Sequence, residues 1–190
     1  MTSNRCYCGS QRLFSRCCEP YLLSAAVALT AEVLMRSRYS SFCTGHVDYL
    51  LATHHPSASS SGDREGLLQT IRATEWLNLL VIDKQKGQKK DTTGVVEFVA
   101  AYRSRLGPAA VSNAASNAAS NAASNTTGNV AQLHERSKFV REKGFVREKE
   151  LVREKSRWFY LEGEILPPYQ PKRSHPCWCG SGKPFKHCHG

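Results

Sequence analysis

The chain has 190 residues, 41% of them hydrophobic, and a formal charge of +10. This length suits one ordinary domain with small additions better than two full domains. No apolar run approaches the roughly 20 residues that a membrane-spanning helix needs, and the first residues lack the basic and apolar regions of a signal peptide. We therefore expect a cytoplasmic protein without a membrane span.

Seven of the eight cysteines lie in two clusters near the ends of the chain, and Cys43 lies apart from them. In a reducing compartment, clustered cysteines are more often metal ligands than disulfides. Two close pairs of sulfur or nitrogen donors suit a tetrahedral zinc ion, so the spacing predicts two zinc ions per chain. Reduced tails or disulfides formed under stress are the alternatives. The first cluster holds Cys6, Cys8, Cys17 and Cys18, and the second holds Cys177, Cys179, Cys188 and His189.

A site closed by four protein ligands has no position for water or substrate, so both clusters predict structure rather than hydrolysis. If seven thiolates bind two zinc ions, each thiolate subtracts one charge and each ion adds two, which lowers the net charge from +10 to +7. A basic protein favours anionic partners such as RNA, ribosomes or acidic proteins. Much of the charge lies in Arg-Glu-Lys repeats that partly cancel, so a solvated mixed surface is the simpler interpretation.

Between the clusters, the hydrophobic pattern changes from a helical period to an alternating one. Met35, Tyr39 and Phe42 fall on one face of a first helix, which Thr30 caps and Gly45 ends. We expect helices over residues 31–43, 46–53 and 63–74, and strands over residues 77–83, 92–103, 132–140 and 157–162, with a hairpin loop at 84–91.

Two repeats interrupt this pattern. Ser-Asn-Ala-Ala units over residues 112–125 have no apolar face and predict a solvated loop between two strands. A six-residue unit containing Val-Arg-Glu-Lys then begins at Phe139, Phe145 and Leu151. A helix would scatter these three side chains, whereas a strand places them on one face. The second repeat therefore predicts a protruding extended hairpin, with a partly helical excursion as the alternative. Residues 165–171, rich in proline, predict a stiff linker.

The last fourteen residues, Cys-Trp-Cys-Gly-Ser-Gly-Lys-Pro-Phe-Lys-His-Cys-His-Gly, resemble the SEC-C motif, the zinc-binding tail of the preprotein translocase motor SecA. The resemblance implies zinc at the second cluster. It also implies docking on a SecB-like chaperone or on the ribosome. On the ribosome the protein would also contact nucleic acid. Trp178 and Phe185 either pack over the metal loop or face a partner, and His175 and His187 are spare imidazoles. The first cluster resembles the same motif, but Gln11 and Arg12 stand where Gly-Lys is usual, which weakens its turn.

Other segments extend the resemblance to the YchJ-like family of uncharacterised bacterial proteins. They are Leu34-Met-Arg-Ser-Arg-Tyr-Ser-Ser-Phe42, His55-Pro56, Thr74-Glu-Trp-Leu77 and Glu135-Arg-Ser-Lys-Phe139. The resemblance implies an α+β fold: a cystatin-like, nuclear-transport-factor-two-like cone of three helices on a curved antiparallel sheet, flanked by two zinc knuckles. We expect a first knuckle at 1–20, a cone at 21–166 with inserts at about 108–129 and 141–155, a linker at 167–174 and a second knuckle at 175–190.

A cone of this type often holds a pocket. The polar and aromatic residues of the shared segments are the candidates to line it: Arg36, Arg38, Tyr39, His55, Trp76 and Arg136. Structural roles are the alternative, such as pairing of an arginine with Glu75 or Glu135, or a core position for Trp76. No nucleophile, base and orienting group form a readable set. A Cys43–His55 dyad competes with the simpler interpretation of Cys43 as a small buried hydrophobe.

The leading hypothesis is a non-enzymatic zinc-binding adaptor, although the sequence does not decide whether the protein is an enzyme. A small-molecule-binding or catalytic cone with accessory knuckles is the second hypothesis. Nucleic-acid binding through the basic knuckles is the third.

Overall fold

The computed structural model describes residues 5–59, 62–105, 130–148 and 151–190. The Ser-Asn-Ala-Ala repeat lies outside these residues. The described helices are η1 (Phe14–Arg16), α1 (Glu19–Leu22), α2 (Ala31–Thr44), α3 (Val47–Ala52), η2 (Pro56–Ala58), α4 (Asp63–Ala73) and η4 (Phe185–His187). The strands are β1 (Thr74–Lys86), β2 (Thr93–Ser104), β3 (Ala131–Glu148) and β4 (Leu151–Ile165). None of the described helices has the length and apolar character that crossing a membrane requires.

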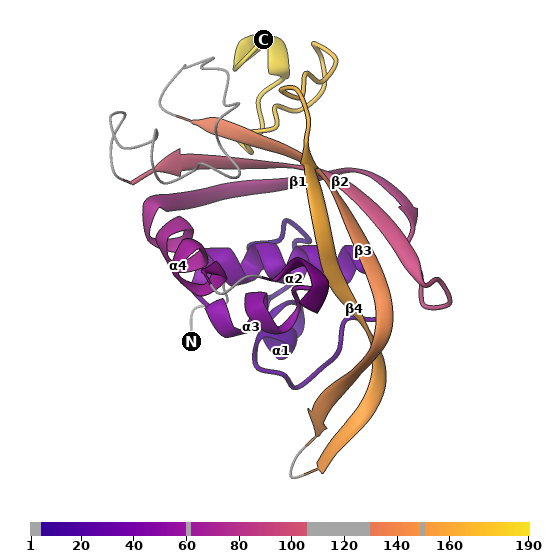
Figure 1. The fold of residues 1–190 in the computed structure, drawn as a ribbon. Helices are drawn as coiled ribbons and strands as arrows, with labels where there is room; N and C mark the ends of the chain where they lie inside the picture. Colours follow the sequence, from indigo (N-terminus) through magenta and orange to yellow (C-terminus); the bar gives the residue numbers. More distant parts are fainter. Residues whose placement is uncertain (1–4, 60–61, 106–129, 149–150) are drawn as a thin grey trace.

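The four strands form one antiparallel sheet in the order β1-β2-β3-β4. Figure 1 shows the sheet curving strongly, with helices α1 to α4 on its concave side. The register between β1 and β2 shifts between Trp76 and Asn78 and again between Val81 and Asp83. Such bulges bend a strand and increase its twist. The α+β cone that was expected from the sequence is therefore confirmed.

Helix α2 has the boundaries that its local signals predict. The Thr30 side chain accepts a hydrogen bond from the amide of Val33 at 3.2 Å, and Gly45 ends the helix with a φ of +81°. The helix is buried on more than the expected face, however, because Ser37, Arg38 and Ser40 are buried as well as Met35 and Tyr39. Small serines allow α3 and the N-terminal knuckle to pack closely around α2.

The boundaries of α4 are confirmed, but those of the strand that follows were wrong. Helix α4 begins at Asp63, as predicted, and Gly62 holds the N-cap position. Strand β1 begins directly after α4 and continues to Lys86, whereas the prediction confined it to residues 77–83. All of the extra residues except Trp76 are polar, but their backbone groups pair with β2 from Ser104 to Gly94, so cross-strand hydrogen bonds outweigh the polarity of these side chains.

The six-residue repeats form a hairpin, as predicted. Strand β3 pairs with β4 without a further break from Phe139 to Glu148, opposite Tyr160 to Leu151. Figure 1 shows this hairpin projecting beyond the helical layer. Since the pairing is extended throughout, the alternative of a helical excursion is wrong for the described part of the repeat.

Both faces of the sheet are covered where β2 crosses the middle. Val96, Phe98 and Ala100 point into the main core with the helices. Val99 and Ala101 point to the opposite face, and they are as fully buried, because the C-terminal knuckle covers them. The sheet thus separates a large core from a small one, and each core contains one cysteine cluster.

Candidate metal centres

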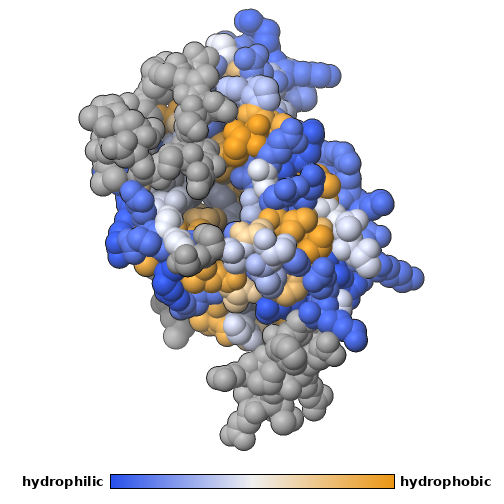
Figure 2. Space-filling model, viewed as in Figure 1, coloured by the Kyte–Doolittle hydropathy of each residue, from blue (hydrophilic) through white to orange (hydrophobic). Residues whose placement is uncertain are grey.

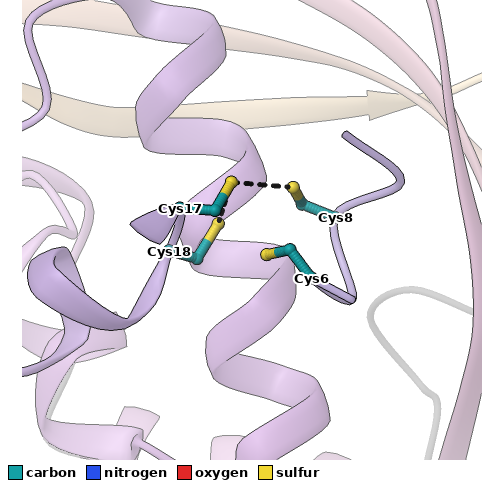
Figure 3. A group of neighbouring side chains, drawn as sticks. All are labelled: Cys6, Cys8, Cys17 and Cys18. Carbon is teal, nitrogen blue, oxygen red and sulfur yellow. Dashed lines mark hydrogen bonds between the residues drawn. The ribbon is translucent and has the colours of Figure 1, made fainter. Parts of the chain in front are cut away.

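The N-terminal cluster brings its four sulfur atoms together. All four lie within 4.8 Å of one another, with 3.7 Å between the sulfurs of Cys8 and Cys17 and 4.0 Å between those of Cys17 and Cys18. Figure 3 shows the Cys6 and Cys8 side chains facing those of Cys17 and Cys18. Helix η1 places the second pair opposite the first.

The C-terminal cluster has the same arrangement with one nitrogen donor. The sulfurs of Cys179 and Cys188 lie 3.5 Å apart, and the Cys177 sulfur lies 3.2 Å from Nδ1 of His189. All four ligand atoms lie within 4.8 Å of one another. His175 and His187 are exposed and do not join this group. The indole of Trp178 is buried and stacks on the His189 ring at 4.5 Å, so Trp178 packs over the metal loop.

These distances fit a bound metal ion. A tetrahedron with zinc–sulfur bonds of about 2.3 Å has edges of about 3.8 Å between its sulfur atoms. A disulfide would need its sulfurs about 2.05 Å apart, and every cysteine among the described residues is free. Both groups can therefore hold a tetrahedral metal ion, with thiolate and imidazole donors that suit zinc.

The close approach of the N-terminal sulfurs also shifts the pKa values of three of the thiols. Hydrogen bonds with Cys6 and Cys8, together with burial, raise the pKa of Cys18, and burial raises the pKa of Cys17. Hydrogen bonds from Cys18 and Cys6 lower the pKa of Cys8. Four thiols this close cannot all ionise by themselves, because each thiolate repels the next. A divalent cation removes that repulsion and allows four thiolates.

The two knuckles are copies of one local structure. The backbone amide of Cys6 donates a hydrogen bond to the carbonyl of Arg12 at 2.7 Å. In the same way, the amide of Cys177 donates to the carbonyl of Lys183 at 2.9 Å. The hydroxyls of Ser10 and Ser181 lie 3.1 and 3.3 Å from the sulfurs of Cys17 and Cys188, respectively. Sequence reasoning missed these serines, although the Gly-Ser pair that follows each Cys-x-Cys was a visible signal.

The glycines of the two turns differ in one informative position. Gly9 and Gly180 have φ values of +75° and +81°. A β-carbon would lie 2.9 Å from the Leu79 carbonyl oxygen at Gly9 and 2.9 Å from the Asn78 side chain at Gly180. Two residues further along each turn, the backbone again has a positive φ. The C-terminal knuckle has a glycine there, Gly182, but the N-terminal knuckle has Gln11 at a φ of +63°. The N-terminal turn is thus strained at Gln11, as its departure from the motif indicated.

The N-terminal centre belongs to the main core. Cys8 has no exposed surface, Cys18 is 2% exposed, and both pack with residues of α2 and β1. The sulfur of Cys6 lies 3.7 Å from the Ser40 hydroxyl, and Arg36 donates to the Cys8 carbonyl at 2.6 Å. Neighbouring elements therefore surround this centre, and the cone is incomplete without it.

The C-terminal centre lies on the outer face of the sheet. Its Cys179, Cys188 and His189 ligands are only half-buried. The knuckle is fixed to β1 by one side-chain hydrogen bond, in which the Asn78 amide donates to the Trp178 carbonyl at 2.9 Å. Because a bulge at Leu77 separates Trp76 from Asn78, the indole of Trp76 can face the main core while Asn78 faces the knuckle.

The linker before the C-terminal knuckle is attached to β3. His134 contacts both the linker and β2. Its Nδ1 lies 2.7 Å from the Pro167 carbonyl oxygen, and its Nε2 lies 3.1 Å from a Glu97 carboxylate oxygen. The Gln132 side chain accepts from the Tyr169 amide at 2.9 Å and donates to the Tyr169 carbonyl at 3.3 Å. These contacts hold the knuckle in a defined position on the sheet.

A cleft of about 630 Å³ lies between the knuckle, the linker and the start of β3. The knuckle contributes Trp178, Phe185, His189 and Gly190, the linker contributes Pro168, Tyr169, Gln170, Pro171 and Arg173, and β3 with the preceding residue contributes Val130, Ala131 and Gln132. Sequence reasoning did not find this cleft, because its walls come from three separate parts of the chain.

The six candidate pocket residues do not all meet. Arg36 pairs with Glu32 at 2.9 Å beside the N-terminal centre. Arg136 lies on the outer face and pairs with Glu97 at 2.8 Å. Burial would raise the pKa of Glu97, but hydrogen bonds from Arg136 and His134 outweigh it and lower that pKa.

The other candidates lie on the concave side in separate contacts. Tyr39 and Trp76 pack edge to face at 5.8 Å, next to Phe42 and Tyr102. Arg38 is buried and donates to Leu50 and Thr53, and its guanidinium lies 4.7 Å from the Tyr160 ring centre.

Cys43 and His55 contact different groups. Burial raises the pKa of Cys43 to about 12, and its neighbour is Tyr39. His55 lies 2.6 Å from the Ser57 hydroxyl and 3.2 Å from a Glu142 oxygen. The described contacts therefore do not join Cys43 and His55 as a catalytic dyad.

Glu135 gives the first prediction, which concerns pH. Burial raises its pKa, although the Ser137 hydroxyl and the Arg38 charge act in the opposite direction. The folded protein thus holds this proton more tightly than the unfolded chain, so the stabilising contribution of the proton is lost as pH rises above the unfolded pKa of about 4.3. We expect Glu135→Gln to become more stable than the wild type, by a margin that grows between pH 5 and pH 8 in urea unfolding. Glu162→Gln at an exposed position is the control, and a constant margin for Glu135→Gln would contradict the prediction.

The comparisons with known proteins agree with this architecture. Residues 30–163 match the family described as YchJ, middle NTF2-like domain, and residues 173–190 match the SEC-C motif. The chain belongs to the YchJ-like family. A UPF0225 protein from Serratia proteamaculans is 33% identical over 97% of this chain and 97% of that protein. A UPF0225 protein from Vibrio cholerae is 31% identical over 97% of this chain and 99% of that protein.

Two solved structures have the same fold. The solution structure of a SEC-C motif containing protein from Rhodopseudomonas palustris has a TM-score of 0.59 and 26% identity, and the match covers 86% of this chain and 99% of that one. The crystal structure of a SEC-C motif containing protein from Psychrobacter arcticus has a TM-score of 0.57 and 23% identity over 99% and 95% of the two chains. The family and fold expected from the sequence are thereby confirmed.

Proposed function

We propose that the protein is a cytoplasmic zinc-binding adaptor that docks on a protein or on the ribosome through its SEC-C knuckles. The C-terminal knuckle makes the contact, and the N-terminal knuckle completes the cone that carries it. Zinc is the metal that the thiolate and imidazole donors favour. A SecB-like chaperone and the ribosome are the partners that the SEC-C resemblance implies.

The observation that carries this proposal is the difference in burial between two otherwise similar knuckles. In the N-terminal group only Cys17 is half-buried, and Cys6, Cys8 and Cys18 are each 5% exposed or less within the main core. In the C-terminal group only Cys177 is as fully buried, and Cys179, Cys188 and His189 are half-buried on the outer face. The N-terminal knuckle is part of the main core of the cone. A second knuckle that is attached on the outside, beyond a proline-rich linker, favours an accessory role such as partner contact.

The closed coordination of both centres also supports an adaptor. Each group already supplies four donors, so a tetrahedral zinc ion would have no open position for a substrate. The metal would then fix the conformation of a short loop that has too few residues to form a core of its own.

The test is a binding comparison between the wild type and the double variant Cys188→Ser, His189→Ala. We expect the wild type to sediment with ribosomes or to bind purified SecB-like chaperone, and the double variant to lose at least about 90% of that binding because its knuckle no longer closes around a metal. His187→Ala is the matched control, since His187 is exposed and stands outside the metal group. Unchanged binding by the double variant, with its C-terminal metal lost, would refute the proposal.

A further inference from the structure

The C-terminal tail is basic over its whole length. Residues 165–190 contain Lys172, Arg173, Lys183 and Lys186 and no aspartate or glutamate. Within the described parts of the chain, no carboxylate forms an ion pair with any of these four. Three thiolates and one zinc ion would together remove a single charge. Figure 2 shows mainly hydrophilic surface at the top of the molecule, where the knuckle lies. An anionic partner fits this surface.

The cleft beside the knuckle adds planar groups to that charge. The Tyr169 and Phe185 rings are half-buried and line it, so each keeps part of its surface open. The exposed Arg173 and the exposed Gln170 line the same cleft. Aromatic rings and guanidinium planes stack on nucleobases, and side-chain amides form hydrogen bonds with base edges and ribose hydroxyls.

The cleft is organised before any ligand binds. Gln132 holds the backbone of Tyr169 by two hydrogen bonds, and the Tyr169 ring packs at 5.7 Å against His134. A site that is already ordered loses little conformational entropy on binding. Its volume of about 630 Å³ lies within the range that encloses a small organic ligand, so one or two nucleotides fit.

We propose that this cleft binds one or two nucleotides of single-stranded RNA, while Lys172 and Lys186, the sequence neighbours of the cleft residues Arg173 and Phe185, contact the flanking phosphates. The proposal rests on the docking role of the C-terminal knuckle and names the chemistry of its partner. An acidic peptide would also satisfy the charge. It would not use the two aromatic rings and the Gln170 amide that line the cleft, which suit unstacked bases. Duplex RNA presents its bases already stacked, so it fits the cleft less well.

The experiment measures fluorescence anisotropy of a labelled ten-nucleotide uridine RNA with the zinc-loaded full chain. At low salt we expect a Kd of about 1–100 µM that weakens steeply as salt is added. Tyr169→Ala keeps the backbone bonds to Gln132 and removes the stacking ring, and Arg173→Ala removes the guanidinium. Each should weaken binding about tenfold, which lies within the range that stacking of one base on a side chain contributes.

The control is Lys90→Ala, which removes the same charge from an exposed side chain in the turn between β1 and β2. That turn lies at the opposite end of β2 from the residues that pair with the start of β3. The control should bind within about twofold of the wild type, since one distant charge changes non-specific binding only slightly. Equal losses for Lys90→Ala and Arg173→Ala would overturn the cleft site, because diffuse charge would then explain the binding.

Two further outcomes separate this proposal from the adaptor itself. If the wild type binds chaperone or ribosomes but neither variant weakens uridine RNA binding, the RNA cleft is refuted and the adaptor stands. If a ten-residue glutamate peptide binds more tightly than the RNA and loses affinity in Tyr169→Ala, the cleft binds acidic peptide and the RNA proposal is overturned. Weaker binding of a duplex of the same length would support the proposal.

Discussion

Replacing Cys8 or Cys18 by serine should destabilise the entire cone, whereas replacing Cys179 should not. Cys8 has 0% and Cys18 2% exposed surface, and both pack in the main core with Leu34 and Leu79. Loss of the N-terminal metal would leave thiols and a strained turn inside that core. Because metal-binding energy is folding energy at such a site, we expect the free energy of unfolding to fall by at least about 4 kcal/mol.

The measurement is a urea unfolding curve for each variant together with the zinc content per chain. The wild type should contain two zinc ions, and each variant one. Cys179→Ser is the matched control, since it opens a centre of the same kind on the outer face; its cone should lose less than about 1 kcal/mol. Equal destabilisation by Cys8→Ser and Cys179→Ser would show that burial does not distinguish the centres, and a wild-type zinc content far below two would remove the premise.

The sequence predicted the features that depend on neighbouring residues. The Thr30 cap and Gly45 end of α2, the close grouping of the two sets of potential metal donors and the hairpin of six-residue repeats each follow from local spacing. The grouping of the donors was predictable because Cys-x-Cys and the closing pair are held by a turn and one short helix. No longer contact is needed to bring the four donors together.

The features it did not predict depend on contacts between distant segments. Ser40 is polar, yet it is fully buried because the N-terminal knuckle packs on it. Val99 points away from the main core and is nevertheless buried, because the C-terminal knuckle, nearly 80 residues later, covers it. The different environments of two similar knuckles, and the cleft beside the second, arise in the same way. Residue patterns do not contain that information.

Arg38 separates the structural from the ligand-binding interpretation of the concave side. Its Nη1 donates to the Leu50 carbonyl and to the Thr53 hydroxyl, each at 2.7 Å, and the residue is 8% exposed. These bonds join α2 to the last turn of α3, where the Leu50 carbonyl also accepts a longer hydrogen bond from the Thr53 hydroxyl at 3.3 Å. Hydrogen bonds from a charged donor contribute more than neutral ones.

We therefore expect Arg38→Met, which keeps the length and most of the volume of the side chain, to lower the free energy of unfolding by about 3 kcal/mol. Arg103→Met is the control, because Arg103 forms an exposed ion pair with Glu75 and should contribute less than about 1 kcal/mol. Urea unfolding of both variants decides between the roles. If Arg38→Met unfolds like the wild type, its guanidinium is not needed for the fold and its conformation would be explained better by a ligand. A loss of the expected size means that Arg38 links two helices and that the fold alone accounts for its buried position.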